Sequence, residues 1–178
     1  KTKNMKKIIT LFLIPFLMSS CALPMKSVVD HSLFKQPYSN PLIVMTYDDY
    51  SVKGFSNDLK ENLEIKFGAE QRNVEILSFE LAGNSLTLNA NKGIDQEIQT
   101  AISKDDKDLL LVFQPTNIYF GEGGYRSFLY QLTGIDTKTN KEVWKANFTA
   151  ARGHFGGKKI AEIVAKTIYE KLKTDKVL

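Results

Sequence analysis

The chain has 178 residues and a net charge of +4, a length that suits one domain preceded by a targeting segment. All of the basic excess lies in the first 20 residues, which hold four lysines and no acidic residue, so the remainder has 20 basic and 20 acidic side chains. A neutral body excludes the broad electrostatic attraction by which basic proteins bind nucleic acid. The lone cysteine, Cys21, excludes an internal disulfide.

Residues 1–20 are predicted to be an export signal. A short basic region, Lys6 and Lys7, precedes the apolar run Ile8–Met18, which is shorter than the ~20 residues that a membrane-spanning helix needs. Two serines stand immediately before Cys21, and the stretch LMSSC resembles the lipobox of bacterial lipoproteins, in which the cysteine is lipidated and the chain is cut before it. The resemblance implies that Cys21 carries a lipid anchor; an ordinary signal peptide with a chance cysteine is the alternative.

The residues after Cys21 indicate where the anchor resides and how the domain begins. Ala22 and Leu23 lack the acidic residue that retains many lipoproteins in the inner membrane of enteric bacteria. If the host is Gram-negative, we therefore expect the outer membrane, facing the periplasm. The next segment is rich in turn-forming residues and lacks a sustained periodicity, which is typical of a tether. The expected division is signal peptide 1–20, lipidated cysteine and tether 21–40, and domain 41–178.

The first part of the domain is predicted to be a βαβ unit. The apolar run 41–50 is typical of a strand buried on both faces, and 73–81 is a second strand. Between them, residues 54–68 form a helix that Gly68 can end. The apolar face of this helix consists of residues four apart, namely Phe55, Leu59, Leu63 and Phe67. Because βαβ crossovers are nearly always right-handed, the two strands are expected to be parallel.

The second part is predicted to be a helix, three strands and a helix. Residues 94–102 form a short helix, and the apolar stretch 109–120 is a central strand whose pairing changes at Pro115. Residues 125–150 form a hairpin around the turn DTKTNKE. Each arm of the hairpin has one apolar face, formed by Phe128, Tyr130, Leu132, Trp144, Ala146 and Phe148. The terminal helix, 158–174, carries an apolar stripe of Ile160, Ile163, Val164, Thr167, Ile168 and Leu172.

These elements define the fold class. The order βαβαβββα predicts a single α/β domain with a mixed β-sheet of about five strands and helices packed on the sheet. The last three strands are expected to form an antiparallel meander. Since no pair of cysteines is present, the domain depends on its apolar core for stability in the oxidising envelope.

The stretch DLLLVF…YRSFLYQLTGIDTKTNKEVWKANF, followed by an amphipathic helix, resembles a broad group of bacterial envelope lipoproteins. The group includes uncharacterised families with a D-x-x-[ST]-[GN]-K-x-V-W hairpin, the amino-terminal domain of TolB, the curli-secretion lipoprotein and the penicillin-binding-protein activator lipoprotein. The letters match only over residues 136–144, whereas the element order matches over most of 41–178. The resemblance implies a non-catalytic domain that binds or scaffolds other envelope proteins, and it transfers no site residues.

Candidate catalytic groups are few. Asp48 and Asp49 follow the first strand, at the end where open α/β sheets collect ligands, although such residues are also common in turns and helix caps. His154 lies in the glycine-rich loop GHFGGKK, whose spacing differs from that of a Walker phosphate-binding loop. No histidine, cysteine or carboxylate set in the sequence has metal-ligand spacing. A small-ligand site or enzyme that uses Asp48, Asp49 and His154 is therefore the alternative function.

The stretch 117–128 is the preferred candidate for function. It places Tyr119, Phe120, Tyr125 and Arg126 around three glycines, and aromatic residues with an arginine are enriched in protein-binding surfaces. The alternative is that the aromatics fold into the core, because strand alternation turns at least half of them inward. We therefore expect a lipid-anchored envelope protein that is not an enzyme, needs no cofactor or metal, and binds another envelope protein through this loop.

Overall fold

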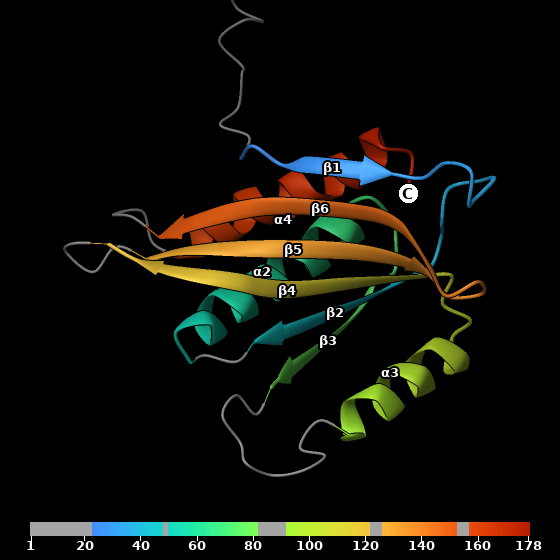
Figure 1. Ribbon diagram of the computed structural model, residues 1–178, viewed down its shortest axis with the longest axis horizontal. Coiled ribbons are helices and arrows are strands. Elements are labelled where there is room, and N and C mark those ends of the chain that lie inside the picture. The colour runs from blue at the N-terminus through green and yellow to red at the C-terminus, as the bar shows by residue number, and fades with distance from the viewer. Residues whose placement is uncertain (1–22, 48–49, 82–91, 122–125, 153–156) are drawn as a thin grey trace, which may run out of the picture.

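The computed structural model describes residues 23–47, 50–81, 92–121, 126–152 and 157–178 (Figure 1). The strands are β1 (Lys26–Val29), β2 (Pro41–Tyr47), β3 (Glu75–Glu80), β4 (Leu109–Phe120), β5 (Arg126–Asp136) and β6 (Lys141–Arg152). The helices in this part of the chain are α2 (Tyr50–Ala69), α3 (Lys92–Lys104) and α4 (Gly157–Thr174). The six strands form one mixed sheet in the order β1-β6-β5-β4-β2-β3.

The pairing of the strands confirms the predicted α/β class. β2 is parallel to both β3 and β4, as the predicted βαβ unit requires, and β4, β5 and β6 form an antiparallel meander. β4 also changes its pairing at the proline. Its last partner on β2 is Met45, opposite Phe113, and its register with β5 shifts between Pro115 and Asn117. Pro115 has no N–H to donate, so the ladder is interrupted where the sequence predicted.

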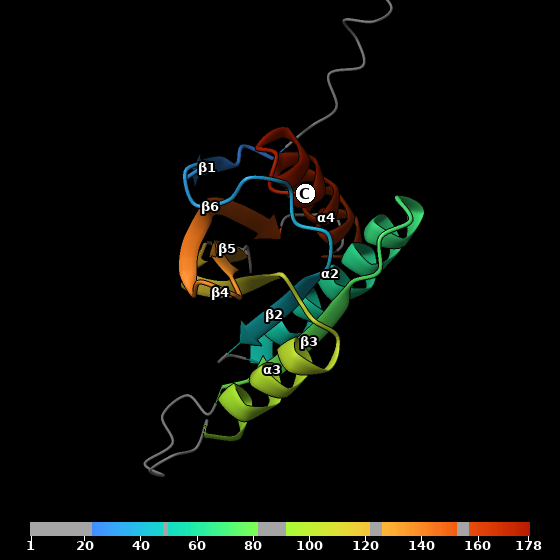
Figure 2. The ribbon, with the colours of Figure 1, turned by 90° about the vertical axis from the view of Figure 1, so that its right-hand side faces the viewer.

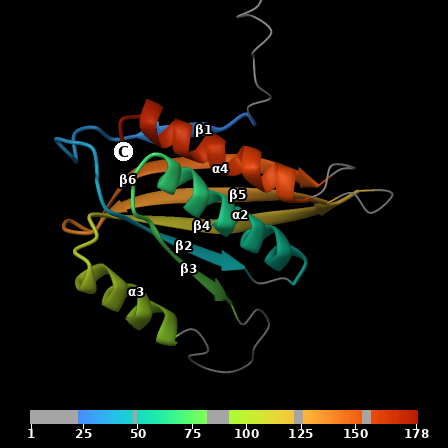
Figure 3. The same ribbon diagram turned by 180° about the vertical axis from the view of Figure 1, so that it is seen from behind.

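Helices cover both faces of the parallel part of the sheet. α2 and α4 lie on one face, and α3 packs on the other face beside β2 and β3 (Figures 1 and 3). Ile43 and Met45 belong to the core under α2 and α4, whereas Leu42 and Val44 belong to the smaller core under α3. This double burial explains why β2 is continuously apolar instead of alternating.

The helix faces agree with the predictions for α2 and differ for α4. Phe55, Leu59, Leu63 and Phe67 of α2 are all buried, as their spacing predicts. In α4 the buried residues are Ala161, Val164, Ala165, Ile168, Tyr169 and Leu172. The predicted stripe is thus rotated, and Ile163 and Thr167 are only half-buried. The reason is that α4 packs against α2 as well as against the sheet, with Tyr169 edge-on to Phe67 at a centroid distance of 5.0 Å.

The end of α2 also differs from the prediction. The helix continues through Gly68 to Ala69, and Gln71 adopts the left-handed conformation with φ 57°. The amide of Arg72 then donates to the carbonyl of Phe67 at 3.0 Å. These contacts form a Schellman-type cap, in which the left-handed residue follows the last helical turn. Glycine is preferred there but not required, so Gly68 was a misleading stop signal.

The sheet has one strand more than the sequence predicted, and that strand lies in the segment expected to be a tether. β1 pairs antiparallel with β6 from Lys26, opposite Asn147, to Val29, opposite Trp144. Further along the same segment, Tyr38 is buried, and its amide donates to the carbonyl of Val177 at 2.8 Å. The segment is therefore attached to the sheet edge and to the C-terminal residues over most of its described length.

The hairpin that carries the lipoprotein resemblance owes its sequence pattern to structural roles. The Asp136 carboxylate accepts hydrogen bonds from the amides of Lys138 and Thr139, at 3.0 and 2.7 Å, and from the Tyr38 hydroxyl at 2.8 Å. Asn140 has φ 54°, a conformation that favours asparagine or glycine. Trp144 is 1% exposed, which confirms that it is a core residue. The described contacts of the motif are thus those of a turn and of a buried core residue.

Candidate binding surface of the sheet

One part of the sheet has no helix over it among the described residues. α2 and α4 lie on one side of β4, β5 and β6, and α3 lies beside β2 and β3, so the other side of β5, β6 and β1 is open (Figure 2). Strand alternation sends the apolar residues of β5 and β6 to the helix side, where Tyr130 stacks on Phe148 with ring centroids 5.1 Å apart. The residues that alternate with these apolar residues on β5 and β6 point to the other side. Together with their partners on β4 and β1, they form what we call the open face.

The open face consists of two rows of mostly polar side chains across four strands. Gln114 on β4 is opposite Gln131 on β5, which is opposite Asn147 on β6, which is opposite Lys26 on β1. The neighbouring row contains Val112, Thr133, Lys145 and Val28. With strands about 4.8 Å apart, each row extends about 14 Å. The face therefore offers amide, hydroxyl and ammonium groups, together with two valine side chains, on the uncovered side of the sheet.

A half-buried carboxylate on the helix side of the sheet holds β1, the edge strand of the open face, in place. Asp175, just after α4, accepts hydrogen bonds from Ser27 Oγ of β1 at 2.6 Å and from Trp144 Nε1 of β6 at 2.7 Å, and Lys171 Nζ lies 2.9 Å away. Partial burial by itself raises the pKa of Asp175, but these hydrogen bonds and the lysine charge outweigh it, so the pKa lies below its usual value. Asp175 thus fixes β1 against β6 and α4.

The β4–β5 end of the sheet extends beyond β2 as an arm, which we define as residues 114–121 and 126–131. Tyr119 lies on this arm opposite Ser127 and is 55% exposed. Asn117 Nδ2 lies 3.5 Å from the Tyr119 hydroxyl. Since Phe128, next to Ser127, faces the core, alternation places Tyr119 on the open side of the sheet. An exposed aromatic side chain thus extends the open face at one end.

The other predicted partner-binding residues are only partly placed. The backbones of Phe120 and Arg126 pair with each other at the end of the arm, but their side chains lie outside the described residues, as does all of Tyr125. Of the predicted cluster the structure therefore places the Tyr119 side chain alone. The prediction missed the open face itself, whose signal is the polar alternation Lys145, Asn147 and Thr149 between buried residues of β6.

The residues of the alternative site and the lipidation site lie outside the described residues. These residues are Asp48, Asp49, His154 and Cys21. In the part of the chain that is described, no group of three or more His, Cys, Asp or Glu side chains is arranged to hold a metal ion. No helix in that part is long and apolar enough to cross a membrane.

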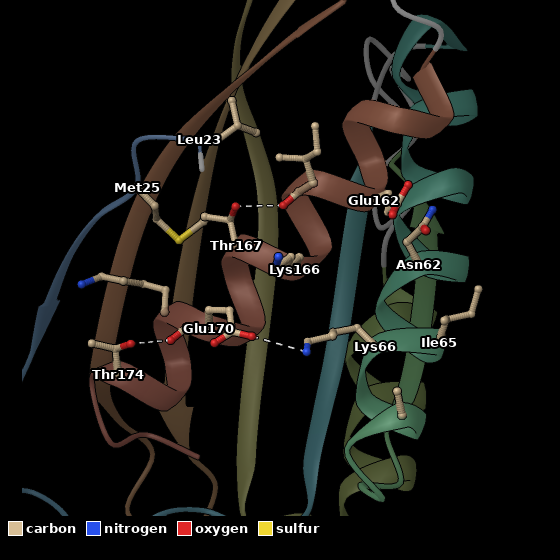
Figure 4. A pocket seen from close by; sticks show the side chains of 13 residues that line it. Leu23, Met25, Asn62, Ile65, Lys66, Glu162, Lys166, Thr167, Glu170 and Thr174 are labelled. Atoms are coloured by element: carbon tan, nitrogen blue, oxygen red, sulfur yellow. Dashed lines mark hydrogen bonds and ion pairs between the residues drawn. The ribbon is translucent and has the colours of Figure 1, made fainter. Parts of the chain in front are cut away.

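A groove lies on the opposite side of the molecule, along the outer surface of α2 and α4. It has a volume of about 940 Å³, and its lining includes Leu23 and Met25 before β1, Ile65 on α2 and Ile163 on α4 (Figure 4). Lys66 of α2 joins the two helices through Glu170 of α4 at 3.4 Å, and it also pairs with Glu70, four residues further on, at 2.9 Å. The hydrogen bond with Glu70 raises the pKa of Lys66, so this cation is held charged between the helices.

Comparison with known proteins finds similar structures but no similar sequence. No protein-family model matches the chain, and no curated protein sequence is similar to it. The PelC dodecamer from Paraburkholderia phytofirmans has a TM-score of 0.53 at 14% identity, over 82% of this chain and 94% of that chain. A PelC variant from the same organism, also a dodecamer, has a TM-score of 0.51 at 12% identity, over 82% and 95%.

A third solved structure is more distant. The lipoprotein GNA1162 from Neisseria meningitidis gives a TM-score of 0.43 at 10% identity, over 76% of this chain and 99% of that chain. At such identities the likeness to PelC shows a shared fold and nothing about activity or partners. The fold itself is therefore one that occurs in at least one other family of bacterial proteins.

Proposed function

We propose that the protein is a lipid-anchored component of the bacterial cell envelope that acts without catalysis, by binding another envelope protein. The observation that carries the proposal is the open face, a mostly polar surface on four strands that no described helix covers, with Tyr119 at its end. Open surfaces with an exposed aromatic side chain suit protein partners, whereas small-molecule sites are concave and largely enclosed. The pattern around Cys21 supports the envelope location.

A photo-crosslinking experiment in living cells tests the binding role. A benzophenone amino acid at Asn147, exposed in the middle of the open face, is expected to give a covalent adduct with a second protein. The same amino acid at Gln99, exposed on α3, is the matched control. Mass spectrometry of the adduct identifies the partner, and a second copy of this chain is one candidate because the PelC structures are dodecamers. No adduct at Asn147, or equal adducts at both positions, would contradict the proposal.

The anchor is tested separately. Cys21→Ser is expected either to release the protein from the membrane fraction or to leave it unprocessed, because acyl chains on this residue supply the membrane affinity. We propose the outer membrane, facing the periplasm, as the location in a Gram-negative host. Separation of inner and outer membranes by density checks the location. Retention of a signal-free Cys21→Ser protein on membranes would show that another part of the chain binds them.

The loop at the end of the arm distinguishes binding from a ligand site. Changing Tyr125 and Arg126 to alanine is expected to weaken partner capture by about 1–4 kcal/mol if these residues are anchors, while folding is retained. Changing Asp48, Asp49 and His154 together is expected to leave capture and phenotype unchanged. Circular dichroism checks that both variants fold. The reverse result, with the phenotype lost only in the triple variant, would favour the small-ligand or enzyme alternative.

A further inference from the structure

The outer surface of α2 and α4 combines a groove with an exposed apolar side chain. Figure 4 shows Leu23 and Met25 on one side of α4 and Ile65, on α2, on the other side. Ile65, a large hydrophobic residue of α2, is 62% exposed. Leu23 and Met25 are half-buried and pack against the core from outside. The groove therefore presents apolar groups from three separate segments of the chain.

The charges of this surface are largely neutralised within the protein. Lys66 pairs with Glu70 and Glu170, and Lys171 Nζ lies 2.9 Å from Asp175. Lys66 also lies 4.8 Å from the centre of the Tyr169 ring. With these ammonium groups committed to internal partners, the long-range field of the surface is weak. Its apolar side chains and the methylene stems of its lysines are what it offers to an external surface.

The length of chain before Leu23 limits what can lie against the groove. Cys21 precedes Leu23 by two residues, and consecutive Cα atoms are about 3.8 Å apart. Whatever path residues 21 and 22 take, the Cα of Cys21 therefore lies within about 7 Å of the Cα of Leu23. A lipid attached to Cys21 and inserted in a membrane would bring the membrane surface to this groove.

We infer that the outer surface of α2 and α4, with Leu23 and Met25, lies against the lipid bilayer in which Cys21 is anchored. The inference rests on the proposed lipidation. The bilayer is the occupant to be expected, because an open groove leaves much of an acyl chain in contact with water, whereas the bilayer covers it completely. Ile65 and Met25 then contact the headgroup region, and Lys166, the exposed lysine of the groove lining, extends its charged end along it.

This orientation fixes where the open face points. α2 and α4 lie on one side of the sheet and the open face lies on the other (Figure 2). With the helices against the membrane, the two rows of mostly polar side chains on β1, β6, β5 and β4 face away from it. A protein on the opposite side can then reach the open face without displacing lipid.

Spin labelling of the lipidated protein in vesicles tests the orientation. The thiol of Cys21 is blocked when it carries the lipid, so Ile65→Cys introduces a single reactive thiol, and Val28→Cys, 77% exposed on the open face, is the matched control. In vesicles of phosphatidylethanolamine and phosphatidylglycerol, the label at position 65 is expected to collide several-fold less often with a water-soluble nickel complex than the label at position 28. Collisions with oxygen, which is more soluble in the bilayer than in water, are expected to be more frequent for the label at position 65 than for the label at position 28.

Three other outcomes would overturn the inference. Equal nickel accessibility at positions 65 and 28 in a lipidated, vesicle-bound protein would refute the orientation and leave the proposed anchor intact. Spin–spin broadening at position 65 that disappears on dilution with unlabelled protein would assign this surface to a second copy of the chain. A mature protein whose mass shows no acyl group would refute both the anchor and the orientation that rests on it.

Discussion

Trp144 joins the hairpin of β5 and β6 to the C-terminal residues, and its replacement tests how the helix side of the sheet is held together. The indole is 1% exposed, and its Nε1 donates to Asp175 at 2.7 Å. Gly134 lies opposite it on β5, where an added Cβ would come within 3.2 Å of the Trp144 Cβ. Because the residue facing Trp144 has no side chain, nothing on β5 can fill the space that the indole leaves.

Trp144→Ala therefore leaves a large cavity, and it is expected to lower the free energy of unfolding by about 3–5 kcal/mol. Trp144→Phe separates packing from hydrogen bonding, because phenylalanine fills most of the space and cannot donate to Asp175. Loss of that one hydrogen bond to a charged group is expected to cost about 2 kcal/mol. Ser27 and Lys171 still contact the carboxylate, so Asp175 is not left without a partner.

Urea unfolding followed by far-ultraviolet circular dichroism measures both costs. Circular dichroism is needed because Trp144 is the only tryptophan of the chain, so its replacement removes the fluorescence signal. Tyr119→Ala, an exposed aromatic on the arm, is the control and is expected to change stability by less than about 0.5 kcal/mol. A loss below about 1 kcal/mol for Trp144→Ala, or equal losses for both Trp144 variants, would refute this account of the packing.

Other parts of the fold give further predictions. The pKa of Asp175 is lowered from 3.8 in the folded state. The stability that Asp175 contributes is therefore complete above pH 3.8 and is lost as the pH falls through the lowered pKa. Asp175→Asn should flatten the dependence of the urea midpoint on pH in this acid range, and an unchanged slope would contradict the prediction. Asp136→Ala removes the acceptor for the turn amides and Tyr38 and should cost about 2–3 kcal/mol in the same unfolding assay, whereas a neutral result would mean that the turn needs no cap. Gln71→Gly relieves a left-handed residue and should raise the melting temperature by an amount equivalent to about 1 kcal/mol, while the control Glu64→Gly inside α2 should lower it.

Local sequence patterns determined most of the elements and much of their pairing. The four-residue spacing of Phe55, Leu59, Leu63 and Phe67 predicts the buried face of α2 because a helix returns to the same face after about one turn. The apolar run of β2 predicts burial on both faces, and Pro115 predicts the break in β4 because it lacks an N–H. These inferences concern properties of a segment or of two segments joined by one crossover, which are encoded locally.

The tertiary structure alone decided how distant segments use one another. Lys26–Val29 has no strong strand pattern, and it becomes a strand because β6, more than a hundred residues later, offers an unpaired edge and Asp175 holds Ser27 beside Trp144. The rotation of the α4 stripe follows from packing against two surfaces at once, which periodicity cannot report. The open face and the groove arise in the same way. Each depends on which faces the helices leave uncovered, and that is settled by the global packing of the apolar core instead of by the sequence of any one element.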